Sequence, residues 1–198
     1  MKRLLLILVL TFSIQSLAKT DDIRDFQIEG MSIGDSALDY FTEDEITKNI
    51  MWHYNDNKKN NEFGIVEFYN YKSAKQYDGI QIAVKPKDKK YKIYVIAGAI
   101  QYVNKKIEDC YSEMQKIDDE LSTVFSSSDR EKNEKKLNAD KTGKSNVKSV
   151  YYFFSDGSNA SVQCYYFSKY YPESDSENNL RVGIRSKEYR NWYFSSLK

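Results

Sequence analysis

Two cysteines, Cys110 and Cys164, constrain the fold of this chain because the patterns around them place one on a helix and the other on a strand. Cys110 lies in a segment from Asn104 to Phe125 in which apolar residues recur at steps of three and four. This spacing predicts an amphipathic helix with Asn104 as its N-cap. Cys110 would then lie on the buried stripe of that helix.

Cys164 falls in a predicted hairpin. The pair Asp156-Gly157 favours a two-residue turn, because a type I′ turn needs positive φ at both positions. Such a turn pairs Ser149 with Cys164 and directs Cys164 toward a core. We therefore expect a Cys110–Cys164 disulfide, which would close a loop of about 54 residues and stabilise the fold by about 4 kcal/mol. The alternative is a pair of buried free thiols, and the lack of a Cys-x-x-Cys motif argues against redox activity.

The first eighteen residues, Met1–Ala18, are typical of a secretory signal peptide. Lys2 and Arg3 form a basic start, an apolar stretch follows, and small residues precede the expected cleavage point. The apolar stretch is shorter than the roughly 20 residues that a membrane-spanning helix needs. An uncut short anchor is the alternative. We expect a secreted domain over residues 19–198, without a membrane span after cleavage, in the periplasm or outside the cell, where oxidising conditions favour disulfides.

The remaining patterns predict an α+β fold with an antiparallel sheet, single or split in two, and helices packed on one face. Thr42 and Glu45 form a capping box for a helix that we expect to reach Trp52. The other predicted elements are strands at 63–71, 79–84 and 91–103, the long helix, a short helix at 129–138, hairpin strands at 147–155 and 158–168, a strand at 180–184 and a closing helix. The order of elements repeats. It fits a tandem arrangement in which residues 19–103 and residues 104–198 each form a helix pair and three strands.

Composition argues against several kinds of chemistry. The chain has 30 Lys and Arg against 29 Asp and Glu, so its net charge of +1 gives no footprint for nucleic acid. His53 is the only histidine, which leaves little material for a zinc site or a Cys-His pair. The acidic run Asp118-Asp119-Glu120 reads as a solvated helix face. We expect no catalytic residue, cofactor or metal site.

Aromatic residues are the unusual feature, with 17 Tyr and 10 Phe. Many lie on or beside the predicted hairpin, and period-two alternation gives both of its faces rings. The candidate binding face comprises Tyr152, Phe154 and Tyr165, turned away from the long helix. Exposed tyrosine suits a protein or saccharide partner because it joins apolar area to a hydroxyl. The alternative is that these rings are strand formers covered by other elements.

The stretch Ile28–Phe41, which reads IEGMSIGDSALDYF, resembles the opening of a family of small, uncharacterised exported bacterial proteins. A looser resemblance, carried by Gly30-Met31-Ser32 and by the order of elements, is to BamE/SmpA and beta-lactamase-inhibitor-like modules. These resemblances imply export, a helix pair and an antiparallel sheet, and they imply no particular activity.

Together these features predict a secreted, non-catalytic binding or interaction module at the cell envelope, with another envelope protein or a saccharide as partner. One alternative is an extracytoplasmic hydrolase with paired carboxylates, which needs a cleft with two converging acids. The other is an envelope-assembly or inhibitor-like module. A concave sheet lined with rings would favour binding.

Overall fold

The structure, a computed structural model, describes residues 23, 26–52, 62–69, 71, 74–172 and 176–196. The predicted leader and His53 lie outside this part of the chain. The described elements are η2 (Ala37–Asp39), α1 (Glu43–Lys48), β1 (Ile50–Trp52), β2 (Gly64–Tyr69), β3 (Gly79–Val84), β4 (Val95–Gln101), α2 (Ile107–Val124), β5 (Asp129–Lys136), β6 (Asn146–Phe153), β7 (Asn159–Tyr166), β8 (Asn179–Arg185) and α3 (Lys187–Ser196).

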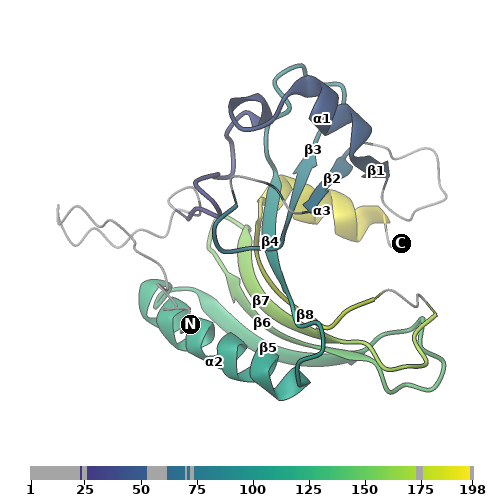
Figure 1. The fold of residues 1–198 in the computed structure, drawn as a ribbon. Helices are drawn as coiled ribbons and strands as arrows, with labels where there is room; N and C mark the ends of the chain where they lie inside the picture. Colours follow the sequence, from purple (N-terminus) through teal and green to yellow (C-terminus); the bar gives the residue numbers. More distant parts are fainter. Residues whose placement is uncertain are drawn as a thin grey trace.

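All eight strands belong to one antiparallel sheet in the order β1-β2-β3-β4-β8-β7-β6-β5. The first four strands and the last four therefore form two meanders, which join where β4 pairs with β8 from Val95↔Arg185 to Gln101↔Asn179. The sheet is strongly curved, with α1 and α2 on its convex side and α3 on its concave side (Figure 1). No helix in the described ranges is long and apolar enough to cross a membrane.

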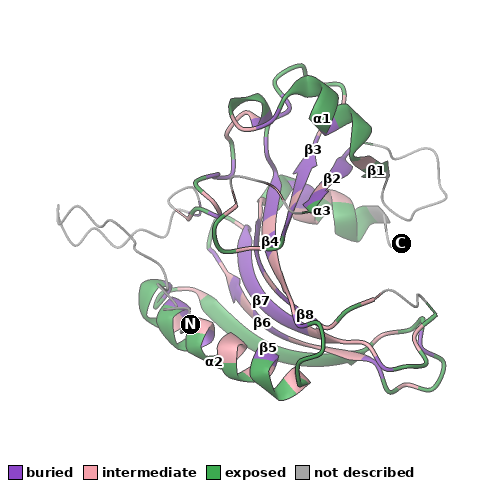
Figure 2. Ribbon diagram, viewed as in Figure 1, coloured by how far each residue is buried: buried purple, intermediate pink, exposed green. Residues whose placement is uncertain are grey.

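The convex face carries most of the core. Ile46 of α1 and Leu121 of α2 are buried in the same cluster as the alternate strand residues that point outward, such as Ile82 and Val162. Phe41, just before α1, stacks on Phe68 of β2 with ring centroids 4.0 Å apart. Strands β7 and β8 in the middle of the sheet are mostly buried, whereas every residue of the edge strand β5 is exposed (Figure 2). Burying this apolar area supplies the main driving force for folding.

The predicted disulfide is present on this convex side. Cys110 in the first turns of α2 bonds to Cys164 of β7, and their Cα atoms are 6.1 Å apart. Both cysteines are fully buried. The bridge joins α2 to the strand against which it packs, as the helix stripe and the strand alternation predicted.

Helix α3 corrects the prediction that all helices pack on one face. Its Tyr189 is buried against Phe63 and Tyr94, in a separate cluster that also contains Ile65 and Val95 of the concave face. The ring centroids of Phe63 and Tyr189 are 5.3 Å apart, in an edge-to-face arrangement. Strands β2 and β4 are covered on both faces at this end, which explains why they read as almost continuous apolar runs.

Three further predictions from local pattern were wrong. The capping box of Thr42 and Glu45 is present, but α1 ends at Lys48 and the chain continues as β1. The segment expected to be a short helix at 129–138 is β5, which pairs with β6 along its whole length. Asn104 has a φ of 55°, so it cannot be an N-cap, and Lys106 takes that position without a side-chain cap.

The hairpin has a different register from the predicted one. Its loop has three residues rather than two, because the Phe154 N–H donates to the Ser158 carbonyl and only Gly157 has positive φ. Asp156 holds the loop by accepting a bond from the Ser158 N–H at 2.7 Å. Tyr152 consequently pairs with Ala160, one position away from the expected register. A slip of one residue exchanges the two faces of β6 relative to β7.

Gly98 lies inside β4, and a glycine within a strand is often a sign of a bulge or a bend. The β3–β4 register runs through Gly98 without interruption, opposite Ile80. The ring of Tyr77 instead lies directly over this glycine, so that a Cβ atom at position 98 would stand 2.4 Å from two ring carbons. A glycine is therefore required here by the close approach of a side chain.

We expect Gly98→Ala to destabilise the protein by about 1–2 kcal/mol, because the Tyr77 ring must move from its site. Urea unfolding followed by circular dichroism measures this loss. In a double-mutant cycle with Tyr77→Ala, the added methyl should cost much less when the ring is absent. An equal cost in the presence and absence of the ring would contradict this explanation.

Candidate functional site

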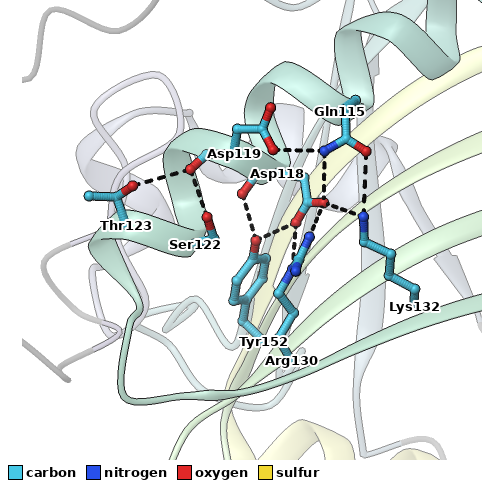
Figure 3. Close-up of polar contacts among 8 residues, drawn as sticks. All are labelled: Gln115, Asp118, Asp119, Ser122, Thr123, Arg130, Lys132 and Tyr152. Atoms are coloured by element: carbon cyan, nitrogen blue, oxygen red, sulfur yellow. Dashed lines mark hydrogen bonds and ion pairs between the residues drawn. The ribbon is translucent and has the colours of Figure 1, made fainter.

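A buried acid cluster at the α2–β5 contact is the first candidate. Asp118 of α2 is fully buried, which corrects the prediction that it belongs to a solvated face. It accepts hydrogen bonds from Arg130 of β5 and, at 2.5 Å, from the Tyr152 hydroxyl of β6, and Lys132 of β5 lies 3.0 Å away (Figure 3). Its neighbour Asp119 is exposed and accepts from Gln115 at 2.7 Å.

The Asp118 carboxylate is held in its charged form. Burial alone would raise its pKa, but hydrogen bonds from Arg130, Tyr152 and Lys132 outweigh burial and lower the pKa to about 2. Every partner in this cluster belongs to α2, β5 or β6, so the cluster ties the helix to the edge of the sheet. We assign it a structural role.

Asp140 is a second buried acid with a similar role. It lies in the loop between β5 and β6, where its carboxylate accepts from the Thr142 and Ser145 backbone N–H groups and from the Ser168 hydroxyl. The hydrogen bond from Thr142, followed by those from Ser145 and Ser168, keeps the pKa of Asp140 well below its usual range in spite of its desolvation. These bonds shape the loop and leave the carboxylate committed to structure.

The concave face of the sheet is the second candidate. In the β5–β8 half, the strand pairing places polar and aromatic side chains on this face. Ser161 and Gln163 of β7 are almost completely buried there, and Gln163 donates to the Tyr151 hydroxyl at 3.0 Å. The face thus has an ordered polar floor. Its residues across β6, β7 and β8 are Val147, Ser149, Tyr151, Phe153, Asn159, Ser161, Gln163, Tyr165, Asn179, Arg181, Gly183 and Arg185. Strand β5 adds Asp129, Glu131, Asn133 and Lys135 at the edge.

Three half-buried arginines stand on this face, and within the described ranges no carboxylate lies in ion-pair reach of any of them. Arg181 and Arg185 come from β8, and Arg190 comes from α3. Arg185 makes only long contacts, 3.4 Å to the Ser161 hydroxyl and 3.5 Å to the Gln163 side-chain oxygen. Burial and the nearby Arg185 charge lower the pKa of Arg190. The arginines of β8 and α3 thus form a cationic strip on a face that also carries the carboxylates of Glu67 on β2 and of Asp129 and Glu131 on β5.

The aromatic rings on this face differ from those predicted. Tyr152 and Phe154 are buried under α2, because the three-residue loop turned their side of β6 toward the convex core. Tyr165 is on the concave face and half-buried. Tyr151 and Phe153 take the places expected for the other two rings, stacked with centroids 5.8 Å apart. Tyr165 forms a second stack with Phe167 at 6.1 Å.

Small residues form a shallow hollow in the middle of the concave face. Its floor contains Gly79, Ala97 and Ala99, and Glu67, Gln81, Tyr69 and Arg181 stand around it. Glu67, which accepts hydrogen bonds from Tyr69 and Gln81, is the one carboxylate among these lining residues. A hollow with a single committed acid lacks the paired carboxylates that the hydrolase alternative needs.

Sequence reasoning missed Arg181 and Arg185, although a signal was present. They alternate with Leu180, Val182 and Ile184 in the predicted last strand, so they had to share the face opposite the core. What the alternation could not show is which other strands contribute to that face. No group of three metal-binding side chains occurs within the described residues.

Comparison with known proteins gives no guide to the function, which is therefore inferred from the geometry described above. No family model, no curated protein and no solved structure matches the chain.

Proposed function

We propose that this protein is an exported, non-catalytic binding module that holds a partner on its concave face. The observation that carries the proposal is the group of three arginines that lack an acidic partner in the described structure, set beside two stacks of rings. Arginine and tyrosine are enriched at the centres of protein contact surfaces. Helices α1 and α2 cover the convex face and α3 covers one end of the concave face, so the rest of the curved inner face is the side available to a partner.

Export to the periplasm or the cell exterior is part of this proposal. The Cys110–Cys164 disulfide supports it, because such bonds persist in oxidising compartments. A tandem origin is a further part. Each half supplies a helix followed by four antiparallel strands, and the last strand of each half pairs with the other at the centre of the sheet. The envelope-assembly or inhibitor-like alternative would use the same concave face.

Blocking the concave face tests the proposal without changing its charge. Ala99 lies half-exposed on the floor of the hollow, so Ala99→Trp should fill the face with a bulky ring. We expect a pull-down from envelope fractions to recover a partner with the wild-type protein and to lose it with Ala99→Trp. Val124→Trp is the matched control, because Val124 is 43% exposed on α2, which lies on the convex side.

Circular dichroism should first show that both tryptophan variants are folded. Recovery of the same partner by all three proteins would refute the concave face as the binding surface. Loss of the partner with Val124→Trp alone would move the binding surface to α2.

A further inference from the structure

Arg181 and Arg185 form no ion pair within the described structure, although Glu67, Asp129 and Glu131 lie elsewhere on the same face. A guanidinium has five donor hydrogens, and Arg181 donates one of them, from Nε to the Asn179 side-chain oxygen at 3.1 Å. Arg185 has the two long contacts to Ser161 and Gln163. Half-buried cations with unused donors cost free energy, and neighbouring cations repel each other. An anion placed on this face would offset both costs.

The spacing of the two β8 arginines defines what such an anion must look like. Arg181 and Arg185 are four residues apart on one strand and point to the same face, which places their Cα atoms about 13 Å apart. Their guanidiniums are held at different places, over the Tyr165 ring and beside Ser161, so each takes its own carboxylate. An extended peptide has the same repeat, so acidic residues at positions i and i+4 would lie over the two arginines.

The rings on this face favour a peptide over a saccharide. Sugars are commonly held by stacking on an open ring face. Here Arg181 lies over the ring of Tyr165, with its guanidinium carbon 5.1 Å from the ring centroid. Arg190 lies over the ring of Phe153 at 5.0 Å. The guanidiniums thus occupy these ring faces, and the stacked geometry holds them ready for carboxylates, to which arginine binds through two parallel hydrogen bonds.

Building on the proposed function, we propose that the concave face binds an extended acidic segment of a protein partner, with one carboxylate on Arg181 and a second on Arg185. The buried Ser161 hydroxyl accepts from Arg185 at 3.4 Å and helps to hold that guanidinium in place. Ala97 and Gly183 form a low floor between the two arginines, because neither carries a side chain larger than a methyl group. A Cβ atom at position 183 would stand only 3.0 Å from the Cβ of Ala97, so the two strands leave no room for a larger residue there. A backbone can therefore approach the sheet along β8.

Short synthetic peptides test this inference directly with the full protein. The first peptide carries Glu at positions i and i+4 in a neutral sequence. The second carries them at i and i+3, which places the acids on opposite sides of an extended chain, and the third has Gln in both places. We expect the first to bind more tightly than the second by about tenfold, and the third to bind least, by fluorescence anisotropy. Binding should weaken as ionic strength rises above ~0.15 M.

Charge removal identifies the arginines responsible. Arg181→Gln and Arg185→Gln should each weaken the first peptide about tenfold, and Arg185→Lys should recover only part of the loss because lysine cannot bind bidentately. The control Lys89→Gln removes one charge, as each arginine variant does, from an exposed position in the turn between β3 and β4, and should change binding little. Urea midpoints close to that of the wild type would confirm that the variants are folded.

Each remaining outcome overturns the acidic-peptide inference. Tight binding of an oligogalacturonate in preference to all three peptides would assign the face to acidic saccharides. Equal binding of the three peptides, or none, would remove the carboxylate recognition. If the peptides fail to bind as expected but Ala99→Trp still loses the partner in the pull-down, the proposed function stands without the acidic-peptide inference. If both tests fail, the concave face is rejected as the binding surface.

Discussion

A protein in which both cysteines are replaced, Cys110→Ala/Cys164→Ala, should lose about 4 kcal/mol of stability. The bridge closes a loop across a sequence separation of 54 residues, and its removal restores the entropy of that loop to the unfolded chain. Domains of this size are stable by only about 5–15 kcal/mol, so the loss would be a large part of the total. Urea unfolding of the oxidised wild type and the double variant measures the difference.

Reductant provides the control for the disulfide prediction. Reduced wild-type protein should unfold at a midpoint close to that of the double variant, which itself should not respond to reductant. The remaining difference would report the packing of the two buried sulfur atoms in the core. Identical midpoints for oxidised and reduced wild type, with the bridge verified by mass spectrometry, would contradict the prediction.

The second large effect is expected at the buried acid of α2, where Asp118→Asn should destabilise the protein by about 2 kcal/mol. Removing the charge leaves Arg130 and Lys132 without the carboxylate that they bind, and weakens the hydrogen bond from the Tyr152 hydroxyl. Asp119→Asn is a matched control, because this neighbouring acid is exposed. Its replacement should change the urea midpoint little.

The effect of Asp118 should depend on pH in a defined direction. The folded-state pKa of Asp118, about 2, is below its ordinary value of 3.8, so the folded protein holds the charged form more strongly than the unfolded chain. Its contribution is fully present above about pH 4 and disappears as the pH falls through 2. The stability gap between wild type and Asp118→Asn should therefore narrow over that range. A gap that stays constant from pH 5 to 2 would show that the carboxylate charge contributes nothing.

Much of the local structure followed from spacing along the chain. The stripe of α2 and the capping box of Thr42 and Glu45 depend on neighbours within one or two helical turns, and both were predicted. The limits of β3, Gly79–Val84, were predicted without error. Such features rest on interactions between residues close in sequence, which a single sequence displays directly.

Segments whose structure depends on a distant partner were predicted less well. The highly charged β5 has no apolar stripe to mark it as a strand, and it is a strand because β6 offers it a complete ladder of hydrogen bonds. Its charges suit an edge strand, since they oppose pairing with another chain. Similarly, α3 packs on the concave side because Phe63 and Tyr94 provide an apolar surface there.

The sequence by itself determined the helix that carries Cys110, the strand that carries Cys164 and the bridge between them, because helical and strand periodicity decide which way each side chain points. The tertiary structure alone decided which rings lie on the concave face. One additional loop residue beside Gly157 turned Tyr152 and Phe154 toward the core and brought Tyr151 and Phe153 to the side of the arginines. The physical reason is that strand register is a choice between pairings of nearly equal local energy, which the competition to bury apolar side chains resolves only in the folded sheet.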